Sequence, residues 1–236
     1  MTKLLVSVST PAEALMALNA GVDIIDLKDP AQGALGALPM DIIKELIRLI
    51  GGRVPVSATI GDIPVDSAAT VFAMEQTANL GVDIVKVGFF GDYKSDRFLE
   101  DTRALTEKGI KVVAVLFADH KFEMGLLHQL KMAGFFGVML DTANKNGKNL
   151  YDYLAMDELK DFVRIAHQTG LESGLAGSLR LADIPVLAPM NPGYLGFRGA
   201  LCVQGDRRSA LRQSSLVKAM NMLQESNSMF EYAGWA

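Results

Sequence analysis

The stretch NAGVDIIDLKDPAQGALGA, residues 19–37, contains a short apolar run that ends in charged side chains. The run VDIIDLK (22–28) has the length and β-branched residues of a buried strand, yet Asp26 and Lys28 lie at its end. Side chains alternate along a strand, so Asp26 and Lys28 point to the same side, about 7 Å apart along the strand. Ile24 shares that side. The run therefore predicts a buried face that carries an acid and an amine.

A second stretch repeats this pattern farther along the chain. The segment GVDII at 21–25 recurs as GVDIV at 81–85, and the equivalent of Asp26 in this copy is Lys86. A looser copy, AGFFGVMLD, begins at Ala133. Two interpretations remain open: a barrel built from repeated two-unit blocks, or one way of entering a strand that is used more than once.

Short β-type runs alternate with amphipathic helical stretches along the chain. Many helical stretches begin with Pro, Asp or Ser and end with Gly, the usual start and stop signals of helices. Eight strands alternating with helices predict a parallel sheet, and eight is the number that closes a (β/α)8 TIM barrel. The expected strands are residues 4–8, 22–28, 54–59, 82–88, 111–117, 136–141, 172–177 and 194–199.

An open, doubly wound sheet is the alternative to this barrel. It is disfavoured because no G-x-G-x-x-G turn follows the first strand. In addition, the charged residues lie at the ends of several strands rather than in a single crevice. No Pro- or Ser-rich linker divides the chain, so residues 1–236 are expected to form a single domain. Roughly the last ten residues, which include Trp235, are expected as a tail.

The composition is that of a globular protein, with 50% of the 236 residues hydrophobic and 21% charged. A net charge of −4 argues against nucleic acid as a partner. The single cysteine, Cys202, excludes an internal disulfide and is interpreted as a core residue rather than a nucleophile. Neither a signal peptide nor a run of about 18 apolar residues is found, so we expect a cytoplasmic protein without a membrane partner.

The charged strand ends predict an active site, because the C-terminal strand ends of a barrel ring its catalytic mouth. This set contains Asp26, Lys28, Lys86 and Asp141. In general a lysine amine has a pKa of about 10.4, and a neighbouring ammonium together with partial burial lowers it. One lysine of such a pair can attack a carbonyl to give a Schiff base while the other moves protons, as in class I aldolases. These residues alone do not say which lysine is covalent, and a purely structural ion-pair network is the alternative.

Two glycine-bearing loops, GLAGSLR (174–180) and GYLGFRGALC (193–202), contain the ends of the last two expected strands. In barrels the loops at this position frequently bind a phosphate through backbone N–H groups. The alternative is that their glycines only form tight corners and that Arg198 is a solvated or interface charge. A phosphorylated carbonyl compound would suit both the lysines and these loops. The candidate N–H donors are Gly177, Ser178, Arg198 and Gly199.

Two further observations concern metal and loop residues. His120, His128 and His167 have neither ligand spacing nor an H-E-x-x-H motif, so no metal site is expected. Lys145 lies in a loop after the sixth expected strand, where its spacing alone favours a surface lysine.

As an ordered set, several segments resemble the (5-formylfuran-3-yl)methyl phosphate synthase family, also called 4-(hydroxymethyl)-2-furancarboxaldehyde-phosphate synthase. They are DIIDLKDPAQGALGA, VSATIGD, DIVKVGFFG, LDTANKNGK, AGSLR and YLGFRGALC. The resemblance implies a (β/α)8-barrel carbon–oxygen lyase without a cofactor. It implies that two glyceraldehyde 3-phosphates are joined with loss of one phosphate and of water. The product supplies the furan ring of methanofuran, a carrier in the one-carbon metabolism of methanogens and some methylotrophs.

The resemblance also implies residue roles. Lys28 of DLKDP matches the Schiff-base lysine, and Lys86 of VKVG matches the general base. The remaining matches to family site residues are Asp26, Asp141 and Lys145.

The sequence departs from the family at two positions beside these motifs. Asn146 stands where an acid is expected, and Asp29 stands where some members have Asn; neither change challenges the reaction class. Another class I aldolase acting on a sugar phosphate and a non-catalytic phosphate-binding barrel remain as alternatives. A small-molecule substrate is the expected partner. A homo-oligomer is compatible with the sequence, which does not fix the number of copies.

Overall fold

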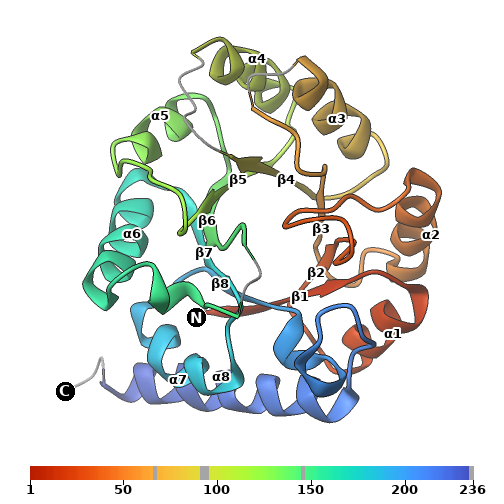
Figure 1. The fold of residues 1–236 in the computed structure, drawn as a ribbon, viewed down its shortest axis with the longest axis vertical. Helices are drawn as coiled ribbons and strands as arrows, with labels where there is room; N and C mark the ends of the chain where they lie inside the picture. The colour runs from red at the N-terminus through yellow and green to blue at the C-terminus, as the bar shows by residue number, and fades with distance from the viewer. Residues whose placement is uncertain (66–67, 91–95, 145–146, 234–236) are drawn as a thin grey trace.

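The computed structural model describes residues 1–65, 68–90, 96–144 and 147–233, with side chains described as far as Met229. Its eight parallel strands follow one another in sequence order around a closed ring, and β1 pairs with β8 to close it (Figure 1). The chain is therefore the (β/α)8 barrel predicted from the alternation, and the open-sheet alternative is excluded. The strands are β1 (Lys3–Val8), β2 (Ile24–Leu27), β3 (Val56–Thr59), β4 (Ile84–Phe89), β5 (Val112–Phe117), β6 (Gly137–Asp141), β7 (Glu172–Leu175) and β8 (Tyr194–Phe197).

Helices enclose the ring of strands (Figure 1). Within the part of the chain that the structure describes, no helix has the length and apolar character to span a membrane. The α-helices are α1 (Pro11–Asn19), α2 (Met40–Ile50), α3 (Ala68–Ala78), α4 (Asp96–Glu107), α5 (Leu126–Met132), α6 (Met156–Thr169), α7 (Ile184–Leu187) and α8 (Gln213–Ala233). The 3-10 helices are η1 (Leu150–Asp152), η2 (Leu181–Asp183), η3 (Ala188–Met190), η4 (Gly199–Leu201) and η5 (Val203–Gly205).

The recurring GVD unit has a local structural cause. In both copies the aspartate precedes its strand, and its carboxylate accepts an N–H at the start of the strand before. Asp23 Oδ2 accepts from Leu4 N at 2.7 Å, and Asp83 Oδ2 accepts from Val56 N at 2.8 Å. Because these residues serve strand entry, β2 begins later than residue 22, where the sequence predicted it. The contacts favour shared entry chemistry as the origin of the repeat.

The barrel interior is apolar at one end and charged at the other. Along β1, β2 and β6 the apolar residues Leu5, Ile24 and Met139 each precede a polar residue by two positions, so each pair shares the inward face. The large Tyr194 ring fits because Gly174 has no side chain; a Cβ there would lie 2.3 Å from the ring. The apolar cluster consists of Leu5, Ile24, Ala34, Leu35, Val113, Val115, Phe117, Met139, Ala176 and Tyr194.

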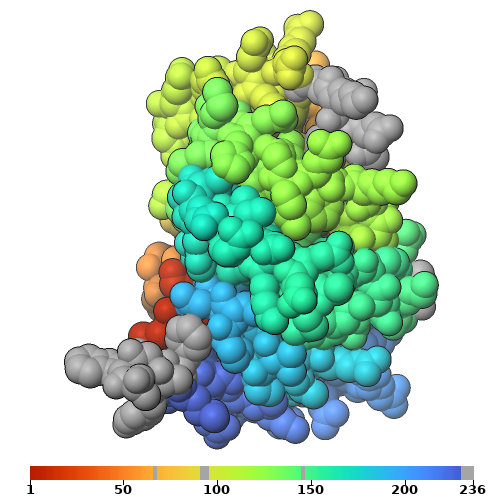
Figure 2. All heavy atoms as spheres, turned by 90° about the vertical axis from the view of Figure 1, so that its left-hand side faces the viewer, coloured from red at the N-terminus to blue at the C-terminus, as the bar shows by residue number. Residues whose placement is uncertain are grey.

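The N-terminal segment is tied to the C-terminal helix α8. The side-chain amide of Asn227 on α8 accepts from Thr2 N at 3.1 Å and donates to Thr2 O at 2.9 Å. Figure 2 shows the red N-terminal residues with the dark blue C-terminal helix below them. Residues 227–233, expected as a tail, continue α8 instead, and Trp235 lies outside the described residues.

Candidate active site

Asp26 forms the floor of the charged end of the barrel and is fully buried. Ser7 of β1 and Ser57 of β3 lie in register with it on the two neighbouring strands, so the three side chains share the inward face. Ser57 Oγ donates to Asp26 Oδ1 at 2.7 Å, and Ser7 Oγ donates to Oδ2 at 2.9 Å. Lys86 of β4 completes the set, with its Nζ 2.7 Å from Asp26 Oδ1. Residues of three strands thus fix this carboxylate in one position.

The surroundings of Asp26 keep it ionised. Burial alone would raise the pKa of its carboxyl, but the nearby Lys86 and Lys28 ammonium groups outweigh that effect, and hydrogen bonds from Lys86 and Ser57 add to it. The pKa of Asp26 is therefore lowered below its ordinary value. A permanent negative charge lies at the base of the site.

Lys28 and Asp141 form a second, looser pair. Lys28 directly follows β2, Asp141 ends β6, and Lys28 Nζ lies 3.7 Å from Asp141 Oδ2. That separation exceeds hydrogen-bond distance. Asp141 Oδ1 is held from the other side by the N–H of Thr142 at 2.7 Å. The predicted set of two lysines and two acids is brought together, as two pairs of different tightness.

The predicted phosphate-binding residues line the rim above these pairs. Gly177 and Ser178 have φ values of +101° and +53°, so this turn places a non-glycine residue in the left-handed region. Such strain is common at functional sites. Among the described residues, the backbone N–H groups of Gly177, Ser178, Arg198 and Gly199 donate no hydrogen bond. These four donors are thus available at the edge of the cavity.

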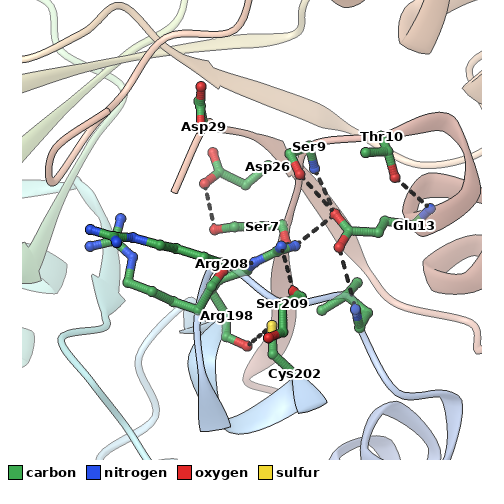
Figure 3. Close-up of polar contacts among 12 residues, drawn as sticks. Ser7, Ser9, Thr10, Glu13, Asp26, Asp29, Arg198, Cys202, Arg208 and Ser209 are labelled. Atoms are coloured by element: carbon green, nitrogen blue, oxygen red, sulfur yellow. Dashed lines mark hydrogen bonds and ion pairs between the residues drawn. The ribbon is translucent and has the colours of Figure 1, made fainter. Parts of the chain in front are cut away.

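The Arg198 side chain has a structural function that sequence reasoning missed. Its guanidinium is buried, neither solvated nor at the surface, and donates to Glu13 Oε2 at 2.7 Å and to the Ser7 carbonyl at 3.1 Å (Figure 3). It also donates to the carbonyl groups of Arg207 and Ser209 at 2.9 and 3.1 Å. Because protein acceptors already engage the guanidinium, the group that Arg198 can offer an incoming anion is its backbone N–H.

Glu13 is the second residue that the sequence did not reveal. In the sequence Thr10 and Glu13 form the T-x-x-E pattern of a helix cap. This pattern explains Glu13 as a capping residue and gives no sign that it also pairs with Arg198. Glu13 Oε2 accepts from Ser9 N and from Arg198, and Oε1 accepts from Leu211 N at 3.3 Å. Burial would raise the pKa of Glu13, but the bonds from Arg198 and Ser9 lower it overall. Only a closed barrel brings α1 beside the segment after β8.

A cavity of about 490 Å³ opens at this end of the barrel. Lys145 and Asn146 lie outside the described residues. Within the described ranges, no three His, Cys, Asp or Glu side chains gather as metal ligands. The lining includes every other predicted site residue, namely Asp26, Lys28, Lys86, Asp141, Gly177, Ser178, Arg198 and Gly199, together with Ser7, Arg180 and Arg207.

Cys202 lies behind this cavity, within the core. Its Sγ donates to the Arg198 carbonyl at 3.2 Å, and burial raises the pKa of the thiol to about 11. A thiol with this pKa is protonated at neutral pH, so the interpretation of Cys202 as a core residue is confirmed.

The chain matches known proteins along nearly all of its length. A family model described as 4-HFC-P synthase matches residues 4–220. The (5-formylfuran-3-yl)methyl phosphate synthase of Methanosarcina acetivorans is 37% identical over 228 residues, which cover 92% of this chain and 97% of the relative. A protein of Methylorubrum extorquens that bears the same name provisionally is 43% identical over 225 residues, or 94% of this chain and 91% of the relative.

Solved structures resemble the barrel at much lower identity. The 3-hexulose-6-phosphate synthase of Salmonella typhimurium aligns with a TM-score of 0.70 at 18% identity, covering 95% of this chain and 100% of the other. The phosphoribosyl anthranilate isomerase of Thermus thermophilus aligns with a TM-score of 0.68 at 12% identity, covering 95% and 99%. These two likenesses support the fold alone. The family-model match and the relatives at 37% and 43% identity go further, and they show that the chain belongs to the 4-HFC-P synthase family.

Proposed function

We propose that this chain condenses two molecules of glyceraldehyde 3-phosphate into (5-formylfuran-3-yl)methyl phosphate through a Schiff base on Lys28. The observation that carries the proposal is the presence of two differently paired lysines in one cavity beneath a rim of backbone N–H donors. The names of the family relatives supply the product. The reaction balances without an oxidant or a reductant, because two trioses yield one furan phosphate, one phosphate and two waters.

Lys28 is the residue assigned to covalent chemistry. Its amine attacks the triose carbonyl, a C–N bond forms, and the carbonyl oxygen leaves as water once it has been protonated. Asp141, with Oδ2 3.7 Å from the amine, is placed to accept the proton that the amine loses and to return it to the departing oxygen. The longer distance from Lys28 Nζ to Asp141, compared with that from Lys86 Nζ to Asp26, favours Lys28 for this role.

Lys86 and Asp26 are assigned to proton transfer at carbon. Converting the iminium to an enamine needs a base for the carbon-bound proton, and the same group can later act as an acid. Asp26, whose pKa is lowered, stays anionic and holds Lys86 Nζ at 2.7 Å within the cavity. Ser7 and Ser57 keep that carboxylate from rotating.

The rim is assigned to a substrate phosphate. Gly177, Ser178, Arg198 and Gly199 present N–H groups at the edge of the cavity, where a bound phosphate would supply their hydrogen-bond acceptors. Lys145 is added to the site through its match to the family motif alone.

The proposal is tested by incubating the protein with glyceraldehyde 3-phosphate alone. A furan aldehyde absorbs in the near ultraviolet and an aldol does not, so absorbance and released phosphate should rise together in a one-to-one ratio. Lys28→Arg is the matched control and should give neither signal. An aldol product without near-ultraviolet absorption would identify another class I aldolase. Absence of both product and covalent adduct would indicate a non-catalytic phosphate-binding barrel.

A further inference from the structure

Arg207 lies across the mouth of the cavity and takes no part in the chemistry assigned above. It follows η5 and lines the cavity with Lys28, Lys86 and the rim. Its Nη2 donates to the carbonyl of Gly33, in the loop after β2, at 2.8 Å. The loop after β2 is three strands from the rim residue Gly177 after β7 and two strands from the rim residues Arg198 and Gly199 after β8. The Arg207 side chain starts beside Gly199, and its guanidinium reaches away from the N–H rim to the loop after β2.

The backbone around Arg207 is held by a buried ion pair. Arg198 Nε donates to the Arg207 carbonyl at 2.9 Å, and Arg198 Nη2 donates to the Ser209 carbonyl at 3.1 Å. Arg198 is itself fixed by Glu13, which also accepts from the N–H of Leu211 (Figure 3). The backbone at Arg207, Ser209 and Leu211 is thereby tied to α1. Such an arrangement gives a charged group a defined position.

The guanidinium of Arg207 has more donors than acceptors around it. It carries five N–H groups, and in the described part of the chain the carbonyl of Gly33 is its one hydrogen-bond acceptor. Burial lowers its pKa, and the neighbouring Arg208 and Arg198 lower it further, whereas Asp141 and Asp62 raise it; the pKa is lowered overall, and both carboxylates lie within electrostatic range. Both are engaged elsewhere: Asp62 accepts the N–H groups of Ala34 and Leu35, and Asp141 is paired with Lys28. A half-buried guanidinium with spare donors is suited to binding an anion.

We infer that Arg207 forms a second phosphate subsite, separate from the N–H rim, which binds the phosphate of the second triose. The assignment of a triose phosphate as the ligand rests on the proposed function. One phosphorylated triose is held at the rim with its carbonyl at Lys28. The other enters with its phosphate against Arg207, which brings two dianionic substrates into one cavity without placing their phosphates together. The four unused N–H groups of the guanidinium match the two-oxygen contact that arginine makes with phosphate.

The first test counts phosphate sites and does not depend on turnover. Equilibrium dialysis with labelled inorganic phosphate is carried out on the wild type, Arg207→Gln, Arg207→Lys and the control Arg212→Gln, whose exposed side chain does not line the cavity. We expect two phosphate ions per chain for the wild type, the control and Arg207→Lys, and one for Arg207→Gln. An equal number of bound phosphate ions in the wild type and Arg207→Gln would overturn the second subsite. So would a single phosphate site in the wild type that Arg207→Gln abolishes.

The second test separates the two trioses. Borohydride trapping reports the first triose on Lys28, whereas furan formation needs both. Arg207→Gln should leave the triose concentration that half-saturates trapping unchanged within about twofold and lower kcat/KM for furan formation by about 10- to 100-fold, with partial recovery in Arg207→Lys. Unchanged furan formation, or an equal loss of trapping and turnover, contradicts the inference. Absence of trapping in the wild type would instead refute the proposed function, and the phosphate count would still decide the subsite.

Discussion

The two lysine–carboxylate pairs of this barrel use the same residue types in different ways. Both pairs are buried, but Lys86 Nζ and Asp26 Oδ1 lie 2.7 Å apart, whereas Lys28 Nζ and Asp141 Oδ2 lie 3.7 Å apart. Asp26 also accepts from two serines on the neighbouring strands. A short, charge-assisted bond within a fixed network holds a charge in place, whereas Lys28 Nζ and Asp141 Oδ2 lie beyond hydrogen-bond distance of each other. The proposed roles follow this difference: field and proton transfer for the first pair, and covalent chemistry for the second.

The largest expected effect comes from Lys28→Arg. Arginine keeps the positive charge near Asp141 but cannot form a Schiff base at neutral pH. Turnover should fall by more than about 10³-fold, while circular dichroism and the urea midpoint stay close to the wild type. Furan formation is measured by near-ultraviolet absorbance. A variant that keeps more than a tenth of the activity would contradict the assignment of the looser pair.

Lys86→Ala should reduce turnover by roughly 10²- to 10⁴-fold, the contribution typical of a general acid–base group. Borohydride trapping on Lys28 should survive, because the first carbonyl attack does not need Lys86 as the nucleophile. Trapping and turnover are measured on the same preparation. If this variant loses trapping while Lys28→Ala keeps it, the roles of the two pairs are reversed.

Asp26→Asn and Asp141→Asn compare the two pairs through stability. Asp26→Asn leaves Lys86 buried beside a neutral group, so the free energy of unfolding should fall by about 3–5 kcal/mol. The loss in Asp141→Asn should be smaller because its contact with Lys28 is longer. Urea unfolding of both variants measures the difference. Equal losses would show that the two pairs are equally tight, and removing both charges in Asp26→Asn/Lys86→Met should restore part of the loss.

The smallest expected effect is a difference in pH dependence. The pKa of Asp26 is lower in the fold than in the unfolded chain, so the unfolded state binds more protons and stability rises with pH in that range. This contribution is present above the unfolded pKa of about 3.9 and is lost as the pH falls through the folded value. The urea midpoint of the wild type should therefore fall more steeply below about pH 5 than that of Asp26→Asn. Parallel curves would contradict the lowered pKa of Asp26. The pKa of Glu13 is also lowered, so both proteins should keep some loss of stability at low pH.

The sequence predicted the parts of this site that follow from strand periodicity. Asp26 and Lys28 lie two residues apart after an apolar run, and Lys86 lies at the same depth in the second copy, so their common face could be predicted. Ser7 could have been found in the same way, since it follows Leu5 by two positions. Strand starts were less certain because Asp23 and Asp83 look like strand residues in the sequence but bind the N–H groups of neighbouring strands.

The remaining contacts could not be predicted because they join segments far apart in the chain. Glu13 and Arg198 meet at 2.7 Å only after β8 has paired with β1, and no local pattern records that meeting. The hydrogen bond from Arg207 to the Gly33 carbonyl likewise depends on how two loops lie over the mouth of the closed barrel. The distinction between a tight and a loose lysine pair requires distances, which spacing in the sequence does not provide.

The most direct test of the account is mass spectrometry of the protein after incubation with glyceraldehyde 3-phosphate and reduction with borohydride. One added triose unit per chain is expected, located by peptide mapping on Lys28 and absent from Lys28→Arg. A triose unit mapped to Lys86, or no added mass in a preparation that forms the furan, would contradict the claim that the more loosely paired lysine is the one that reacts.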